Sequence, residues 1–130
     1  MNAPCIIGWG HTPFGKLDAA DSEQLIRDAV SPALASAGLQ ASDIDGVFVG
    51  HYNGGFLPQD FTASLVAMAV PELRHVPAVR LENACATGSA AIWAALESYR
   101  PAFRQTQAQL FQAKLGLSSS QLPPVTLSPV

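Results

Sequence analysis

The sequence predicts an α/β fold whose sheet contains parallel strands, and two observations support this prediction. Short apolar runs bounded by glycine or proline alternate with longer stretches of helical period, in the order strand, helix, strand, helix, strand, helix. This alternation is typical of parallel strands joined by right-handed crossovers. The composition also suits a packed domain, because 48% of the 130 residues are hydrophobic and only 13% are charged.

The first predicted pair is a buried strand at Pro4–Trp9, with Cys5 in the core, followed by a helix. Asp21 is placed to cap the start of this helix, and Gly38 to end it. Pro32 interrupts the helical pattern, since an interior proline costs about 3 kcal/mol or kinks a helix. We therefore expect two short helices, with Pro32 opening the second.

The second and third pairs follow the same order. Val47–Gly50 is apolar throughout, which predicts a strand buried on both faces. A helix around Phe61–Met68 leads to a third strand at Ala78–Leu81. The stretch Asn83–Leu96 has no charged side chain, which predicts a helix buried on all sides.

Charge and cysteine content exclude several classes of protein. The net charge of −3 gives no basic surface for nucleic acid, and no apolar run reaches the length of about 18–20 residues that spans a membrane. The first residues lack the pattern of a secretion signal. Cys5 and Cys85 have no metal-ligand spacing and form no disulfide framework, so we expect no metal and a reducing, cytoplasmic location.

The composition changes near residue 100. All ten acidic residues lie before Ser98, whereas the chain from Tyr99 onward is rich in glutamine and proline and has no acidic residue. We therefore expect a domain at residues 1–100 and a divergent, disordered tail at 101–130.

Cys85 is the residue best placed for chemistry. It follows the strand that ends near Glu82, where the next helix begins, and active sites of α/β sheets form at such carboxyl ends of strands. N–H groups in the first turn of a helix favour the nucleophilic thiolate and can stabilise an oxyanion. The alternative is a small buried residue, as free cysteines commonly are. Glu82 and Asn83 are candidates for hydrogen bonds that position the strand end. His11 and His51 follow predicted strands, but ordinary loop polarity accounts for them better than catalysis.

Three segments resemble a known family, in the order that the family has them. Glu82–Ala91, with the sequence Glu-Asn-Ala-Cys-Ala-Thr-Gly-Ser-Ala-Ala, closely resembles the nucleophile segment of thiolases, particularly the sterol-carrier-protein type and related bacterial and archaeal acetyl-CoA acetyltransferases. Thr12–Lys16 resembles the opening loop of the family. Ala37–Leu39 and Asp43–Gly50 resemble the passage into its second strand. The resemblance covers about residues 5–98.

This resemblance implies the N-terminal half of a thiolase-like fold, truncated, with a mixed sheet and a buried nucleophile helix. It implies that Cys85 is the catalytic residue, which takes an acyl group from an acyl-CoA as a thioester. Coenzyme A thioesters would be substrates, no cofactor would stay bound, and the complete protein would be a homodimer. The family's activating histidine, its second cysteine and much of its CoA-binding loop have no counterpart here. We therefore expect the chain to be inactive alone, with its CoA-binding residues unknown.

Two alternatives to a thiolase-like acyltransferase stay open at this stage. One is a thiolase-like lyase that cleaves sterol side-chain CoA thioesters by a retro-aldol reaction, because such lyases have a similar cysteine segment. A non-catalytic remnant or interaction protein is the other alternative, because residues 100–109 do not resemble the strand that follows in family members.

Overall fold

The computed structural model describes residues 4–18, 21–53 and 58–98. The chain divides into two compact units, residues 1–96 and 97–130, and the described part of the second is Glu97 and Ser98. The described elements are, in order, the helix α1 (Ser22–Ala37), the 3-10 turn η1 (Ala41–Asp43), the strand β1 (Val47–Gly50), the helix α2 (Thr62–Ala69), the 3-10 turn η2 (Pro71–Leu73), the strand β2 (Ala78–Leu81), the 3-10 turn η3 (Ala84–Ala86) and the helix α3 (Thr87–Ser98). The predicted tail at 101–130 lies outside the described residues.

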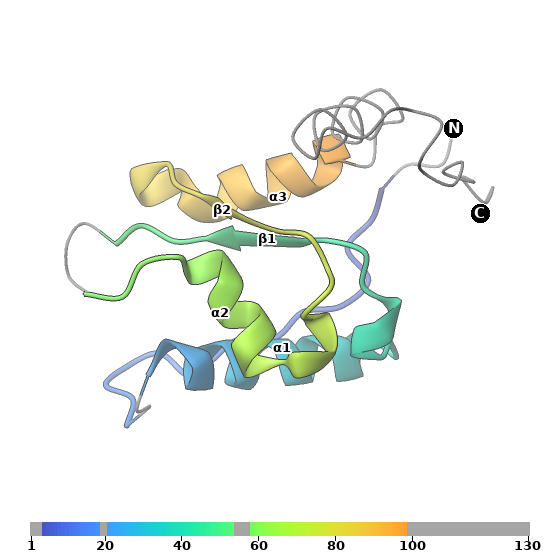
Figure 1. Ribbon diagram of the computed structural model, residues 1–130, viewed down its shortest axis with the longest axis horizontal. Coiled ribbons are helices and arrows are strands. Elements are labelled where there is room, and N and C mark those ends of the chain that lie inside the picture. The colour runs from blue at the N-terminus through green and yellow to red at the C-terminus, as the bar shows by residue number, and fades with distance from the viewer. Residues whose placement is uncertain (1–3, 19–20, 54–57, 99–130) are drawn as a thin grey trace. The chain divides into compact units, whose positions relative to one another are not determined.

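The two strands form a parallel pair, joined by a crossover that contains α2. Their register runs from Val47 opposite Ala78 to Gly50 opposite Leu81. Figure 1 shows α3 on one side of this pair and α2 on the other, and α2 also contacts α1. The predicted α/β class, with a parallel crossover, is confirmed. In the described residues the sheet has this parallel pair alone, so the mixed sheet that the resemblance implies is not seen there.

Helix α1 begins and ends where the sequence predicts, but it is a single helix. The Asp21 carboxylate accepts a hydrogen bond from the Gln24 N–H at 2.8 Å, and Gly38 ends the helix in the left-handed conformation, with φ of 69°. The prediction of two short helices is wrong, because Pro32 lies inside one continuous helix. A proline there removes the single bond to the carbonyl of residue 28, and the turns on either side keep theirs.

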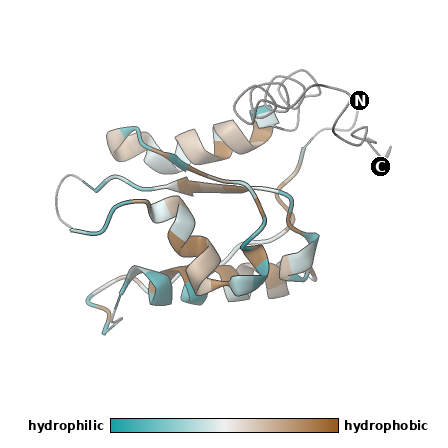
Figure 2. Ribbon diagram, in the orientation of Figure 1, coloured by the Kyte–Doolittle hydropathy of each residue, from teal (hydrophilic) through white to brown (hydrophobic). Residues whose placement is uncertain are grey.

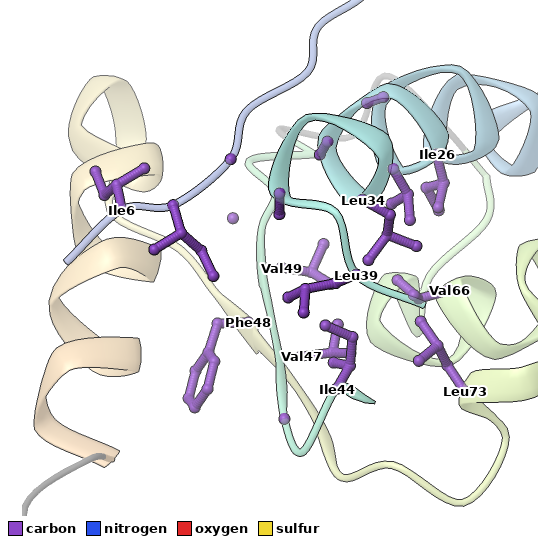
Figure 3. Close-up of a pocket in the computed structure, with 18 of the residues that line it drawn as sticks. Ile6, Ile26, Leu34, Leu39, Ile44, Val47, Phe48, Val49, Val66 and Leu73 are labelled. Atoms are coloured by element: carbon purple, nitrogen blue, oxygen red, sulfur yellow. The ribbon is translucent and has the colours of Figure 1, made fainter. Parts of the chain in front are cut away.

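The first predicted strand is absent from the described structure. Residues 4–10 form no sheet pairing, and Cys5, Ile6 and Trp9 are exposed instead of buried. The segment lies against α1, where a Cβ on Gly8 would stand 2.7 Å from the Ala33 carbonyl oxygen. This close packing on a helix replaces pairing with a strand, and an apolar cavity lies between the segment and β1 (Figure 3).

The described core is small and centres on α2. Its buried apolar side chains are Leu65, Val66, Ala69 and Leu73, while α1 has no buried residue. The apolar face of α1 instead lines the cavity, which measures about 630 Å³ and is bordered on its other side by β1. The prediction that Val47–Gly50 is buried on both faces is therefore wrong, because three of its residues are only half-buried and Gly50 is exposed.

Helix α3 forms as predicted, but its predicted burial is absent. Thr87 is its buried residue, whereas the side chains of Ile92 and Trp93 are 54% and 64% exposed. Figure 2 shows apolar residues on this helix without a covering element in the described structure. The reason is that the described sheet has two strands, and nothing described lies over the outer side of α3.

Candidate active site

Cys85 lies in the short turn that connects β2 to α3. Strand β2 ends at Leu81, η3 carries Cys85 at its centre, and α3 begins two residues later at Thr87. The thiol is free and its residue is exposed. The sequence places Cys85 in the first turn of the α-helix, whereas the structure places it in the 3-10 turn just before that helix. The alternative of a small buried residue does not describe this position, because Cys85 is exposed in the described structure.

The backbone around Cys85 is tightly turned. Ala84 has a φ of 43°, in the left-handed region that a residue with a Cβ rarely adopts. The N–H of Ala86 donates to the Asn83 carbonyl at 2.8 Å, and the N–H of Thr87 donates to the Ala84 carbonyl. Because these two N–H groups already have acceptors, they are not available to an oxyanion. Stabilisation of an oxyanion therefore requires donors other than the N–H groups of Ala86 and Thr87.

Thr87 fixes the end of this turn. Its side chain is buried, and its hydroxyl oxygen accepts a hydrogen bond from the Asn83 N–H at 2.8 Å. Gly50 lets the turn approach β1, since a Cβ there would stand 2.8 Å from the Thr87 carbonyl oxygen. The predicted role of Asn83 in positioning the strand end is thus performed by its backbone.

Arg80 fixes the beginning of the same turn. Its guanidinium donates to the Glu82 carboxylate at 2.5 Å, to the Asp60 carboxylate at 2.6 Å and to the His51 carbonyl at 3.2 Å. The predicted hydrogen bonding of Glu82 is present, and Arg80 is its partner. Three segments of the chain therefore meet at one side chain, next to the strand end that leads to Cys85.

The two histidines that follow predicted strands have different surroundings. The His51 N–H donates to the Leu81 carbonyl at 3.0 Å, and its ring Nδ1 lies 3.0 Å from the hydroxyl of the buried Thr62. His51 thus lies at the carboxyl edge of the sheet from which Cys85 follows. His11 stacks on Trp9, with ring centroids 5.3 Å apart, and its ring Nδ1 lies 2.8 Å from the carbonyl oxygen of Thr12.

Sequence reasoning missed four residues of this site: Asp60, Thr62, Arg80 and Thr87. Arg80 offered a signal, because it is the one charged residue in a strand that is otherwise apolar. The other three are ordinary polar residues near helix starts, and only the pairing of β1 with β2 brings them together. No group of three His, Cys, Asp or Glu side chains suited to a metal ion occurs within the described residues.

The described structure thus belongs to the class of α/β domains, and it has an exposed thiol at the carboxyl edge of its sheet, between a parallel strand and a helix. Comparison with known proteins identifies the family. Residues 5–110 match the thiolase N-terminal domain, and the chain belongs to that family. The resemblance to thiolases that the sequence predicts is thereby confirmed.

Two archaeal proteins similar to this chain are acetyl-CoA acetyltransferases. The one from Methanocaldococcus jannaschii is 40% identical over 93 residues, and the one from Methanothermobacter thermautotrophicus is 33% identical over 93 residues. In both comparisons the matched segment covers 71% of this chain and 24% of the relative. The chain thus spans about a quarter of the length of these relatives.

No helix within the described ranges combines the length and the apolar character needed to cross a membrane.

Proposed function

We propose that this chain supplies the nucleophile of a thiolase-like acyltransferase. In this proposal the Cys85 thiolate attacks the carbonyl carbon of an acyl-CoA, forms a thioester and releases coenzyme A as its thiol. A second acyl-CoA-derived carbanion then attacks the thioester and frees the cysteine, or the cycle runs in the direction of thiolysis. Coenzyme A thioesters are substrates of this reaction, and no bound cofactor takes part. The thiol must stay reduced, which suits a cytoplasmic setting.

The observation that carries the proposal is the position of Cys85. An exposed thiol in a tight turn at the carboxyl end of a parallel strand can meet a substrate, and the left-handed Ala84 beside it is the kind of backbone outlier that clusters at active sites. The names of the archaeal relatives favour an acetyltransferase over a retro-aldol lyase. The alternative of a non-catalytic remnant is decided by experiment.

The isolated 130-residue chain is expected to be inactive. A cysteine nucleophile needs a base to accept its proton and groups to hold the substrate. The described structure places no such base against Cys85, and the matched segment covers 24% of the relatives. We propose that a complete homodimeric protein supplies these groups.

A chimeric enzyme tests the proposal. The 93 matching residues of the Methanocaldococcus jannaschii acetyltransferase are replaced by those of this chain, and the product is incubated with acetyl-CoA. Intact mass and peptide mapping should show one acetyl group on Cys85. Turnover should fall by at least about a thousandfold in the Cys85→Ala chimera, since loss of a nucleophile removes the covalent route.

The matched control is Cys5→Ala, which removes the other exposed thiol and should leave acetylation and turnover intact. Acetylation of the Cys85→Ala chimera, or a folded chimera without acetylation at Cys85, would refute the assignment. Steady turnover by the 130-residue chain alone would refute its expected inactivity.

A further inference from the structure

We propose that Arg80 is a positioning residue for Cys85. Its guanidinium holds the strand end that leads into the cysteine turn and neutralises the two carboxylates that it contacts, Asp60 and Glu82. This inference rests on the proposed role of Cys85 as a nucleophile.

The geometry starts from the register of the two strands. Arg80 lies opposite Val49 in the parallel pair, one residue before β2 ends. Its side chain is 27% exposed and reaches the three acceptors already described: Glu82 on its own segment, the backbone of His51 after β1, and Asp60 before α2. One planar group therefore joins both strand ends and the loop that leads into α2.

Such a contact set requires an arginine. A guanidinium presents five N–H donors in a fixed, planar arrangement, whereas a lysine ammonium is a single point of charge on a flexible stem. A single exposed ion pair contributes about 0–1 kcal/mol to stability. The main consequence of joining three segments is thus a fixed position for the strand end rather than a large gain in stability.

Cys85 lies between two such anchors. Before it, Arg80 holds Glu82. After it, the buried Thr87 holds the Asn83 N–H through its hydroxyl. The turn between these anchors is short and contains the left-handed residue Ala84, so we expect a displacement of Glu82 to move the thiol as well.

Charge adds a second effect. Glu82 is three residues before Cys85, and Asp60 meets the same guanidinium. Negative charges near a thiol disfavour the thiolate, and a neighbouring positive charge counters them. The titratable or charged groups that these contacts join are His51, Asp60, Arg80 and Glu82. Without Arg80, two carboxylates at this edge would have no positive partner in this contact set.

The test measures alkylation of Cys85 by iodoacetamide as a function of pH, in the 130-residue chain with Cys5→Ala. In Arg80→Met the rate at neutral pH should fall about threefold to tenfold, and the profile should move to higher pH. Arg80→Lys should recover part of the rate, because it restores the charge without the planar contacts. Arg74→Met is the matched control; it removes one positive charge whose described hydrogen bond is to His75, and it should leave the profile unchanged.

Glu82→Gln separates this effect from unfolding. Unfolding would move every variant toward the rate of an ordinary exposed thiol. By contrast, removal of one carboxylate while Arg80 remains should move the profile to lower pH, opposite to Arg80→Met. An unchanged profile in Arg80→Met, a shift in the same direction in both variants, or an equal shift in Arg74→Met would overturn the proposal.

This experiment is independent of acyl chemistry, because iodoacetamide needs neither coenzyme A nor a second half of an enzyme. If the chimera fails to acetylate Cys85 but the alkylation shifts occur, the proposed function fails and the contact set stands. If Cys85 is acetylated and the alkylation shifts are absent, the role of Arg80 fails and the function stands.

Discussion

At the scale of single residues, the unusual feature is the left-handed backbone at two positions, within the part of the chain that the structure describes, that are not glycine. Phe61 has a φ of 56° and directly precedes α2, and Ala84 has a φ of 43° and begins η3. Each lies where the chain passes from the carboxyl side of a strand into a helix. Left-handed backbone costs a residue with a Cβ about 1–2 kcal/mol. The surrounding contacts must supply that energy, and at Ala84 they are the bonds of Asn83 and Thr87.

Ala84→Gly should stabilise the chain. Glycine adopts positive φ without strain but loses about 0.5–1 kcal/mol in backbone entropy, so the free energy of unfolding should rise by about 0.5–1 kcal/mol. Urea denaturation followed by circular dichroism measures this change. Ala86→Gly is the control in the same turn; Ala86 lacks positive φ, so this variant should lose stability. A loss of stability in Ala84→Gly would show that its backbone is not strained.

At the scale of elements, the clearest packing contact is the one between residues 4–10 and helix α1. Gly8 and Gly10 let its backbone touch the helix, since a Cβ on Gly10 would stand 2.4 Å from the Ala29 carbonyl oxygen. Backbone atoms of a helix cannot move aside as a flexible side chain can. Any side chain at these two positions must therefore displace the segment.

Gly8→Ala should destabilise the chain by about 1 kcal/mol, the lower end of the range for overpacking, because the segment can shift outward. Gly88→Ala should do the opposite. Its added Cβ meets nothing within 4 Å, and alanine in a helix is favoured over glycine by about 0.5–1 kcal/mol. Urea denaturation of the two variants should thus give changes of opposite sign. Equal stability of Gly8→Ala and the parent chain would mean that the segment does not lie on α1.

Local signals in the sequence predicted most of the described helices and strands. The cap at Asp21, the stop at Gly38 and the apolar runs at Val47–Gly50 and Ala78–Leu81 depend on neighbours within a few residues, so periodicity and capping rules identify them. The position of Cys85 near a helix start was predictable for the same reason, and the family resemblance supplied the chemistry that we propose for it.

Burial, strand pairing and side-chain contacts between distant segments were not predictable in this way. Whether Pro4–Trp9 pairs as a strand depends on what lies beside β1, and the exposure of α3 depends on what covers it. The contacts of Arg80 depend on the register between two strands that lie 31 residues apart along the chain, in the pairing of Val47 with Ala78. No local pattern contains that information.

At the scale of the whole molecule, the described chain leaves much of its apolar surface uncovered. The side chains of Ile92, Trp93 and Leu96 on α3 are 39–64% exposed. Large exposed apolar patches usually mark places where another protein surface binds. The matched segment covers 24% of its relatives, so the lack of a covering element agrees with the length of the match.

The chain should therefore associate with itself through α3. Sedimentation velocity over a series of concentrations should show a rising average mass, and Trp93→Lys should weaken the association about tenfold, because a buried tryptophan at the centre of an interface contributes about 1–2 kcal/mol or more. Phe14→Lys is the matched control. It also replaces an exposed aromatic residue by lysine, but its 99% exposed side chain lies in a loop outside α3. A constant mass at all concentrations, or equal weakening by Phe14→Lys, would show that the apolar face of α3 does not drive association.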